Sequence, residues 1–261
     1  MQVRDAMTTN VLVLSPETGV GEAAQLMSER DTTAALVDPG EGARPGIFTV
    51  RDVLALVAQG SDFRREALAD HFSPDAQAAA PDASLQQAAE MMLEGEFRHV
   101  VVSGDDGNPG FLVMRDIVAH RLAGGAVPGT SHPIFEAMRT TPLTVEHDTS
   151  VRETAQRMIE GQAGAAVVEG AKKGERPGIF TERVLLHAVA DGRDVDRDRM
   201  ADHPNAQMTF SSPEWSLRQA AEAMVKGRFQ HVVVVDRHTI RGVVSMRDVM
   251  RQWTEEDREE G

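Results

Sequence analysis

One octapeptide pattern recurs four times along the chain, and it constrains the fold more than any other feature. It reads GIFTVRDV from Gly46, GFLVMRDI from Gly110, GIFTERVL from Gly178 and GVVSMRDV from Gly242. The first two copies are 64 residues apart, the last two are also 64 apart, and the first and third are 132 apart. Such spacing indicates two successive duplications that produced four repeats, each of which forms the same set of helices and strands.

The residues around the octapeptide predict the secondary structure of each repeat. An amphipathic helix precedes it, with apolar or small residues at i, i+3, i+4 and i+7. These positions are Val20, Ala23, Ala24 and Met27, then Leu85, Ala88, Ala89 and Met92, then Val151, Thr154, Ala155 and Met158, and finally Leu217, Ala220, Ala221 and Met224. A β-branched run follows each helix, and the octapeptide adds a strand and a second helix. We therefore predict an α/β (α+β) protein of four tandem β-α-β-β-α repeats.

Capping residues mark the starts of the first helices. A serine is followed three residues later by glutamine or glutamate in three repeats, which predicts capping boxes at Ser84 with Gln87, Ser150 with Glu153, and Ser216 with Gln219. The first repeat has Gly19 with Glu22 in these places.

A repeat of about 60 residues buries too little surface to be stable alone, so we expect neighbouring repeats to pair. The stretch RLAGGAVPGTSHP is rich in glycine and proline and favours a module boundary there. The predicted divisions are repeat 1 at 1–63, repeat 2 at 64–124, a linker at 125–133, repeat 3 at 134–195, repeat 4 at 196–253, and an acidic tail at 254–261. For the tail we expect a solvated helix end or disorder.

Composition excludes several classes of function. The net charge of −14 opposes nucleic acid or an anionic membrane as the main partner. The absence of cysteine excludes thiol nucleophiles, disulfides and sulfur-ligated metals, and no histidine pair has the spacing of a metal site. No apolar run approaches the roughly 18 residues of a membrane span, and the N-terminus lacks the apolar stretch of a secretory signal. We expect a cytoplasmic protein.

The octapeptide itself has two interpretations. Thr49 with Asp52, and Ser245 with Asp248, match the S/T-x-x-D pattern of a helix start, and the motif can be no more than a strand feeding a capped helix. Alternatively, the free amides and positive dipole end of the helix favour an anion. A hydroxyl that donates to a phosphate and a carboxylate that accepts from a ribose would then suit a nucleotide.

Basic residues recur at the motif. Arginine occupies the same position in all four repeats, and two more arginines precede the glycine in repeats 1 and 3: Arg51, Arg115, Arg183 and Arg247, with Arg44 and Arg176. In an acidic chain they can supply the charge that a phosphate needs, or they can be solvated helix residues paired with nearby acids. His99 and His231 open matching strands and are either packing and hydrogen-bonding residues or phosphate contacts.

The pattern G-h-h-S/T-x-x-D-h, preceded by an apolar strand and a capped helix, resembles the cystathionine-β-synthase (CBS) domain over nearly the whole chain. The resemblance implies that repeats pair through their sheets into two Bateman modules, with clefts for AMP, ADP, ATP or S-adenosylmethionine, with or without Mg²⁺, and no required cofactor. It further implies that Asp52, Asp116 and Asp248 take the ribose and that Thr49, Thr181 and Ser245 take the phosphate. Adenine would lie against Val11, Thr33 and Ala34, with Arg98 and His99 near the same cleft.

Two repeats depart from the family pattern. Repeat 2 has Val113 where the hydroxyl belongs, and repeat 3 has Val184 where the acid belongs. Loss of one charge-assisted hydrogen bond costs about 1.5 to 3 kcal/mol, or roughly tenfold to a hundredfold in affinity. We therefore expect binding at the motifs of repeats 1 and 4, weaker binding at repeat 2, and an empty or non-standard site at repeat 3.

No catalytic triad, phosphate loop or acid–base pair can be argued from spacing, which predicts a protein without enzymatic activity. The leading hypothesis is a stand-alone regulatory protein that senses an adenosine-containing ligand and signals to an unknown protein partner through changed module geometry. The alternatives are a scaffold or interaction module that binds no ligand, and a small enzyme acting on a bound nucleotide. Apolar helix faces such as Leu54, Leu56 and Val57 suit either an intramolecular disc of two modules or a homodimer.

Overall fold

The computed structural model describes residues 1–40, 44–103, 109–124, 132–170, 177–203, 209–237 and 239–260. Over these residues it contains four three-stranded sheets, and each sheet takes its strands from a single repeat. The predicted α+β class with four repeats is therefore confirmed, and four repeats are the number that two Bateman modules require. The predicted linker at 125–133 falls outside the described residues except for His132 and Pro133, and the predicted domain boundaries stay predictions.

Repeat 1 shows the element order that the other repeats follow. It contains β1 (Val13–Leu14), α1 (Val20–Glu29), β2 (Ala34–Val37), β3 (Gly46–Thr49) and α2 (Val50–Gln59). Strand β2 is central, parallel to β1 and antiparallel to β3. All four residues of β2 are buried, which explains why this strand is a continuous apolar run rather than an alternating one.

The remaining elements repeat this order. Repeat 2 contains β4 (Ala78–Ala79), α3 (Leu85–Glu94), β5 (His99–Ser103), β6 (Pro109–Val113) and α4 (Met114–Ala123). Repeat 3 contains α5 (Ile134–Ala137), β7 (Thr144–Val145), α6 (Val151–Glu160), β8 (Ala165–Val168), β9 (Gly178–Thr181) and α7 (Glu182–Ala190). Repeat 4 contains β10 (Thr209–Ser211), α8 (Leu217–Gly227), β11 (His231–Asp236), β12 (Thr239–Ser245) and α9 (Met246–Glu260). Short 3-10 turns lie at Val3–Asp5, Leu68–Asp70 and Met200–Asp202.

The helix faces predicted from periodicity are all buried. Every position in the i, i+3, i+4, i+7 sets of α1, α3, α6 and α8 has its side chain in the core. Thr154, the one hydroxyl among them, donates to the carbonyl of Ser150 at 2.9 Å, so its burial leaves no unsatisfied donor.

The predicted caps are only partly observed. Reciprocal boxes form at Ser84 and Ser216. At α6 the Ser150 hydroxyl accepts the Glu153 amide at 3.1 Å, but the Glu153 carboxylate pairs with Arg157 at 2.6 Å, because an arginine one turn later offers a charge-assisted bond. The prediction of a full box there is wrong.

The cap expected at α1 is also replaced. Gly19 supplies no side-chain cap. Instead the amides of Val20 and Gly21 donate to the carbonyls of Glu66 and Phe63 at 2.9 and 3.0 Å. A loop that is distant in sequence therefore satisfies the donors at the start of this helix.

The chain divides into two compact units, and each combines a repeat from the first half with one from the second. The 1/3 unit comprises residues 11–76 and 143–206, and the 2/4 unit comprises residues 1–10, 77–142 and 207–261. The chain therefore begins in the 2/4 unit, alternates between the two units along its length, and ends in the 2/4 unit.

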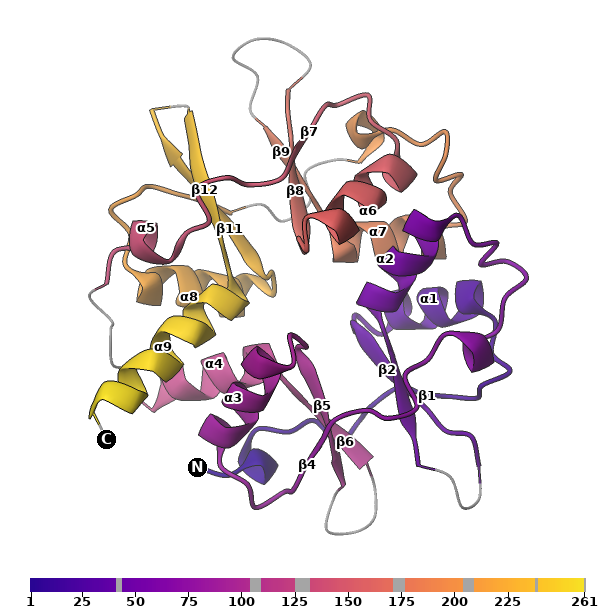
Figure 1. Ribbon diagram of the computed structural model, residues 1–261, viewed down its shortest axis with the longest axis horizontal. Coiled ribbons are helices and arrows are strands. Elements are labelled where there is room, and N and C mark those ends of the chain that lie inside the picture. Colours follow the sequence, from indigo (N-terminus) through magenta and orange to yellow (C-terminus); the bar gives the residue numbers. More distant parts are fainter. Residues whose placement is uncertain are drawn as a thin grey trace. The chain divides into compact units, whose positions relative to one another are not determined.

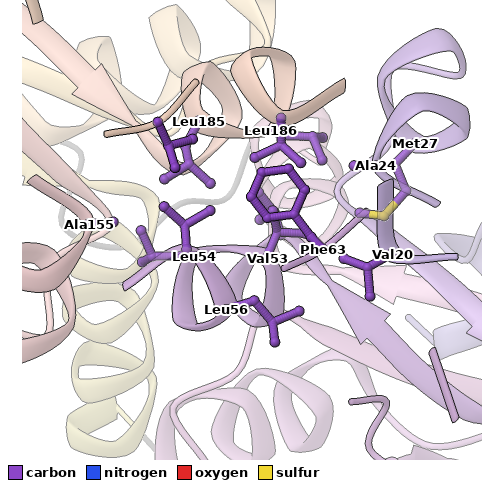
Figure 2. Packing of buried hydrophobic residues seen from close by; sticks show 14 of the residues in the cluster. Val20, Ala24, Met27, Val53, Leu54, Leu56, Phe63, Ala155, Leu185 and Leu186 are labelled. Carbon is purple, nitrogen blue, oxygen red and sulfur yellow. The ribbon is translucent and has the colours of Figure 1, made fainter. Parts of the chain in front are cut away.

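Helices join the two repeats of the 1/3 unit into one core. Helix α2 packs against α6 and α7, and α1 packs against α7 (Figure 1). Val53 and Leu54 of α2 face Leu185 and Leu186 of α7, as Figure 2 shows. The apolar face that includes Leu54, Leu56 and Val57 is therefore buried within this single chain.

The 2/4 unit is built in the same way. Helix α4 packs against α8 and α9, and α3 packs against α9. Trp253 of α9 is fully buried, with the guanidinium of Arg121 5.7 Å from its ring centroid. Helix α9 continues through the predicted acidic tail to Glu260, and Thr254 is buried there and donates to the Met250 carbonyl at 2.8 Å. Of the two expectations for the tail, a helix end is the one observed.

Candidate functional site

Each octapeptide occupies the turn from the third strand of a sheet into the following helix. Its fourth residue ends the strand and stands just before the helix: Thr49 before α2, Val113 before α4, Thr181 before α7 and Ser245 before α9. The predicted strand-to-helix geometry is therefore present in all four repeats. Each turn is a helix N-terminus, the feature on which both interpretations of the motif depend. The first amide of each helix donates to a backbone carbonyl, as the Met246 amide does to Gln230 at 2.9 Å.

The motif glycine is required because another segment of backbone crosses it. A Cβ atom on Gly110 would lie 2.7 Å from the carbonyl oxygen of Thr8, and one on Gly242 would lie 2.5 Å from that of Arg139. Gly46 faces the carbonyl of Ser73 in the same way. The crossing segments form β-bridges beside these glycines. They come from elsewhere in the chain, which is why the sequence alone indicated only a strand start.

In repeat 1 the hydroxyl and carboxylate of the motif are in direct contact. The Thr49 amide and hydroxyl donate to Oδ2 of Asp52 at 2.6 and 2.8 Å, and the Arg51 amide donates to the Thr49 hydroxyl at 3.2 Å. This is a reciprocal capping box, so the motif of repeat 1 does form the capped helix start that the first interpretation expects. Both bonds to Asp52 end on Oδ2, which leaves Oδ1 directed away from them.

Burial shapes the acidity of Asp52. Desolvation raises the pKa of its carboxyl group, while the bonds from Thr49 and the charge of Arg51 act in the opposite direction. A partly buried carboxylate gains from each further hydrogen bond that it accepts, because the bond offsets the loss of water. A ligand hydroxyl is such a donor.

The other residues predicted for repeat 1 gather at the same end of the sheet. Ala34 is the partner of Thr49 across β2 and β3, and the Val50 amide donates to the Thr33 carbonyl at 3.0 Å. Val13 pairs with Leu36, so the parallel register brings Val11, two residues earlier, to the level of Ala34. Val11, Thr33, Ala34, Thr49 and Asp52 therefore lie at one end of this sheet, with Val11 on the β1 side of β2 and Thr49 on the β3 side.

Repeat 4 reproduces the geometry of repeat 1. The Ser245 amide and hydroxyl donate to Oδ2 of Asp248 at 2.8 and 2.6 Å, and the Asp248 amide donates to the Ser245 hydroxyl at 3.3 Å. Oδ1 of Asp248 lies 3.9 Å from the guanidinium of Arg251. His231 is the cross-strand partner of Ser245, which places this predicted residue beside the motif.

Repeat 2 lacks the hydroxyl, as the sequence showed, and charges surround its acid instead. Val113 gives α4 no side-chain cap. Burial raises the pKa of Asp116, and the charges of Arg115, 3.9 Å away, and of Arg228 from repeat 4 act to lower it. The acid of repeat 2 is therefore influenced by an arginine of the repeat with which it shares a core.

His99 lies beside the motif of repeat 2 as an uncharged side chain. It is the cross-strand partner of Val113 and stands edge-on to Phe111, with ring centroids 6.1 Å apart. Burial, reinforced by the charges of Arg98 and Arg115, lowers the pKa of His99 to about 3. At neutral pH it can hydrogen-bond to a phosphate but cannot form an ion pair with one. The Arg98 side chain donates to Gln230 of repeat 4.

Repeat 3 lacks the motif acid and has a glutamate two residues before that position. Thr181 still caps α7 by accepting the Val184 amide at 3.3 Å, but Val184 provides no carboxylate. Glu182, two residues earlier, is 3% exposed, and its Oε1 lies 3.1 Å from Nη1 of Arg51 in repeat 1. Sequence reasoning overlooked this residue, although the other repeats have only Val50, Met114 and Met246 in its place.

The motif arginines mostly reach across to the paired repeat. Arg51 pairs with Glu182, Arg183 pairs with Asp31, and Arg247 donates to the backbone carbonyl of Glu96. Arg51 and Arg183 thus pair with acids, as the alternative interpretation expects, whereas the contact of Arg247 is with a backbone carbonyl. Arg44 is exposed, and Arg176 lies outside the described residues.

Two further features of the described ranges are their metal-ligating side chains and the length and polarity of their helices. No group of three or more His, Cys, Asp or Glu side chains within them could hold a metal ion. None of the helices in the same ranges is long and apolar enough to cross a membrane.

Comparison with known proteins agrees with the repeat structure. The sequence model of the CBS domain matches residues 3–59, 68–123, 134–191 and 202–255. The CBS domain-containing protein YhcV of Bacillus subtilis is 29% identical over 135 residues, which cover 50% of this chain and 95% of YhcV. The Meiotically up-regulated gene 70 protein of Schizosaccharomyces pombe is 23% identical over 95% of this chain, which spans only 34% of that protein.

A solved structure shares the whole fold. Protein MJ1225 from Methanocaldococcus jannaschii superposes with a TM-score of 0.82 over 97% of this chain and 99% of its own, at 16% identity. At this identity the likeness establishes the fold alone.

Proposed function

Because the chain belongs to the CBS domain family, we propose that it is a regulatory protein that senses adenosine-containing ligands at the motifs of repeats 1 and 4. One observation carries the proposal. In both repeats a hydroxyl and a carboxylate lie within 2.8 Å of each other at a helix N-terminus: Thr49 with Asp52, and Ser245 with Asp248. The two groups that would hold phosphate and ribose are therefore already adjacent, with the helix amides behind them.

Binding at these motifs needs little rearrangement. A ribose hydroxyl would donate to Oδ1 of Asp52 or Asp248, the oxygen that the capping bonds do not use. The Thr49 or Ser245 hydroxyl would rotate from its carboxylate toward a phosphate oxygen, so a ligand donor replaces a protein donor. The helix start stays capped while the ligand is bound, because the hydroxyl oxygen still accepts the amide of Arg51 or Asp248 when its proton turns to the phosphate, and the backbone amide bond to Oδ2 is retained.

The other proposed contacts differ in strength among the repeats. At repeat 1 we assign the apolar side chains of Val11 and Ala34, with Thr33, to the adenine ring. At repeat 2 we assign a weaker site to Asp116, Arg98, Arg115 and neutral His99, because Val113 supplies no hydroxyl. At repeat 4 we assign His231 and Arg247 to the phosphate, and at repeat 3 Thr181 alone remains for this role.

The proposed output is a change of geometry read by a partner protein rather than a chemical reaction. A ligand can shift an equilibrium between two arrangements only by its difference in affinity for them. We propose a cytoplasmic location, with AMP, ADP, ATP or S-adenosylmethionine as the ligand and with Mg²⁺ only as a companion of a polyphosphate.

Thermal unfolding with each of the four ligands tests the proposal. At a hundredfold excess over the dissociation constant, a ligand that binds the folded chain stabilises it by about 2.7 kcal/mol. Asp52→Ala and Asp248→Ala should each remove part of the shift. Val184→Ala is the matched control, because the same motif position in repeat 3 has no carboxylate to lose, and it should leave the shift intact.

One observation favours a second function, that of a scaffold without ligands. The hydroxyl and carboxylate of each intact motif already satisfy one another, and motif arginines join paired repeats. A melting point that does not respond to any of the four ligands would support the scaffold and contradict the sensor.

A further inference from the structure

Repeat 3 differs from its three counterparts at two nearby positions of the octapeptide. It has valine at position 184, where the others have Asp52, Asp116 and Asp248, and it has glutamate at position 182, where the others have Val50, Met114 and Met246. An acidic residue therefore stands at a position that is apolar in every other copy. The contacts of Glu182 show which group balances its charge.

Glu182 is a buried carboxylate with a defined counter-charge. Only 4% of its side chain is exposed, and its Oε1 lies 3.1 Å from Nη1 of Arg51, whose own side chain is 40% exposed. Burial of a carboxylate is unfavourable unless it is paired, and here the guanidinium and the N-terminal end of α7 both compensate it. The pair joins repeat 3 to repeat 1 within the 1/3 unit.

Arg51 also belongs to the motif of repeat 1. Its amide donates to the Thr49 hydroxyl at 3.2 Å, and the positive charge of its side chain opposes the rise that burial causes in the pKa of Asp52. The same guanidinium therefore acts on the proposed ribose carboxylate and on Glu182. A phosphate held by Thr49 would meet an arginine whose charge another residue already balances.

We propose that Glu182 is a specificity-determining residue, which balances the charge of Arg51 and so makes the repeat 1 site prefer a monophosphate over a di- or triphosphate. This inference rests on the proposed function of that site. Each added phosphate brings negative charge toward a carboxylate that solvent and salt screen poorly, because it is buried. The ion pair as a whole has no net charge with which to attract the longer chain.

Repeat 4 provides an internal comparison. Its motif arginine, Arg247, contacts a backbone carbonyl of repeat 2, and the position in repeat 2 equivalent to Glu182 is Met114. A buried methionine there places no carboxylate opposite the repeat 4 motif. We expect the repeat 4 site to discriminate less between AMP and ATP than the repeat 1 site does.

The test uses the full chain with Asp248→Ala, so that the repeat 4 site is silenced and repeat 1 is the tighter of the two proposed sites that remain. Titration calorimetry with AMP and with ATP, in buffer without Mg²⁺, gives the ratio of the two affinities. Adding Glu182→Gln should raise the affinity for ATP relative to AMP about tenfold, the effect of roughly one charge-assisted hydrogen bond. Asp31→Asn, which removes the partner of Arg183 in the same unit, is the matched control and should leave the ratio unchanged.

A second variant guards against misfolding. Glu182→Met introduces the residue found at this position in repeats 2 and 4, where it is buried, and it should shift the ratio in the same direction. An unchanged ratio of ATP to AMP affinity in both variants overturns the proposal. A lower ratio also overturns it, because it would show that Glu182 holds Arg51 in position to bind the phosphates. If neither the Asp248→Ala chain nor its Glu182 variants bind AMP or ATP, the proposed adenine-nucleotide site at repeat 1 fails, and this proposal fails with it. Binding that depends on Asp52 but not on Glu182 refutes this proposal alone.

Discussion

Replacement of Thr49 by valine tests how much the motif hydroxyl contributes to the stability of the chain and how much to nucleotide binding. The substitution keeps the shape of the side chain and removes only the hydroxyl. The fold accepts valine in this setting, because Val113 occupies the same position in repeat 2 with an extended backbone, φ −109° and ψ 143°, against −127° and 166° at Thr49. The consequence should therefore be electrostatic rather than steric.

The structure allows the cost to be estimated. The Thr49 hydroxyl accepts the Arg51 amide at 3.2 Å, and loss of such a cap costs about 1 kcal/mol. It also donates to Asp52 at 2.8 Å, but the backbone amide of Thr49 continues to donate to the same oxygen at 2.6 Å. The second loss is therefore smaller than that of an isolated bond to a charged group, and about another 1 kcal/mol is expected. Together these give about 2 kcal/mol.

Urea unfolding at pH 7 measures this cost as a lower midpoint with an unchanged slope. Val113→Thr is the reciprocal variant and should stabilise the 2/4 unit by about 1 kcal/mol through a new cap on α4. Stability that is unaffected by Thr49→Val would refute the assignment of the hydroxyl to the helix cap. Unchanged nucleotide affinity in the same variant would refute its assignment to the phosphate.

Three further predictions concern single residues. Burial lowers the pKa of His99 in the folded chain to about 3, below the unfolded value near 6.5. The contribution of neutral His99 to the free energy of unfolding is therefore present above pH 6.5 and is lost as pH falls toward 3, at about 1.4 kcal/mol per pH unit. His99→Gln should flatten this part of the stability–pH curve, and a His99 NMR resonance that titrates near pH 6.5 would contradict the prediction. Gly242→Ala should destabilise the chain by about 1 to 3 kcal/mol in thermal unfolding, since the new methyl group meets the Arg139 carbonyl, whereas Gly124→Ala, with contacts of 3.6 Å or more, should not. The pKa of Asp52 is raised by burial, so its stabilising contribution is present below pH 3.8 and is lost as pH rises through the folded pKa. Asp52→Asn should therefore fold at pH 7 at least as stably as the parent chain while binding AMP more weakly, and a large loss of stability would show that the charge serves the fold.

Local features of the fold were predictable because they depend on residues close together in sequence. Helix faces follow from a spacing of three and four residues, so periodicity alone is enough to assign Val20 and Met27 to the core. The same holds for the turn between β3 and α2, where Thr49 and Asp52 are three residues apart. Even here a neighbour can interfere, since Arg157 takes the carboxylate that was expected to complete the Ser150 cap.

Features that join distant segments were not predictable from one sequence. The apolar face around Leu54 would suit any helix of the right shape, so it did not reveal that repeat 1 shares its core with repeat 3. The need for Gly46 arises from a backbone segment near Ser73 that crosses it. The pairing of Arg51 with Glu182 spans 131 residues, and its only signal in the sequence was an acid in a position that is apolar in the other repeats.

Native mass spectrometry with AMP measures the central claim directly, because it counts the ligands that each chain holds. The AMP concentration should saturate the sites of repeats 1 and 4 and stay below the dissociation constant of the weaker repeat 2 site. The wild-type chain should then carry two molecules of AMP, Asp52→Ala and Asp248→Ala one each, and the double variant none. A wild-type chain that binds neither AMP nor any of the other three ligands, or a count of two that persists in the double variant, would contradict the assignment of nucleotide sites to the strand-to-helix turns of repeats 1 and 4.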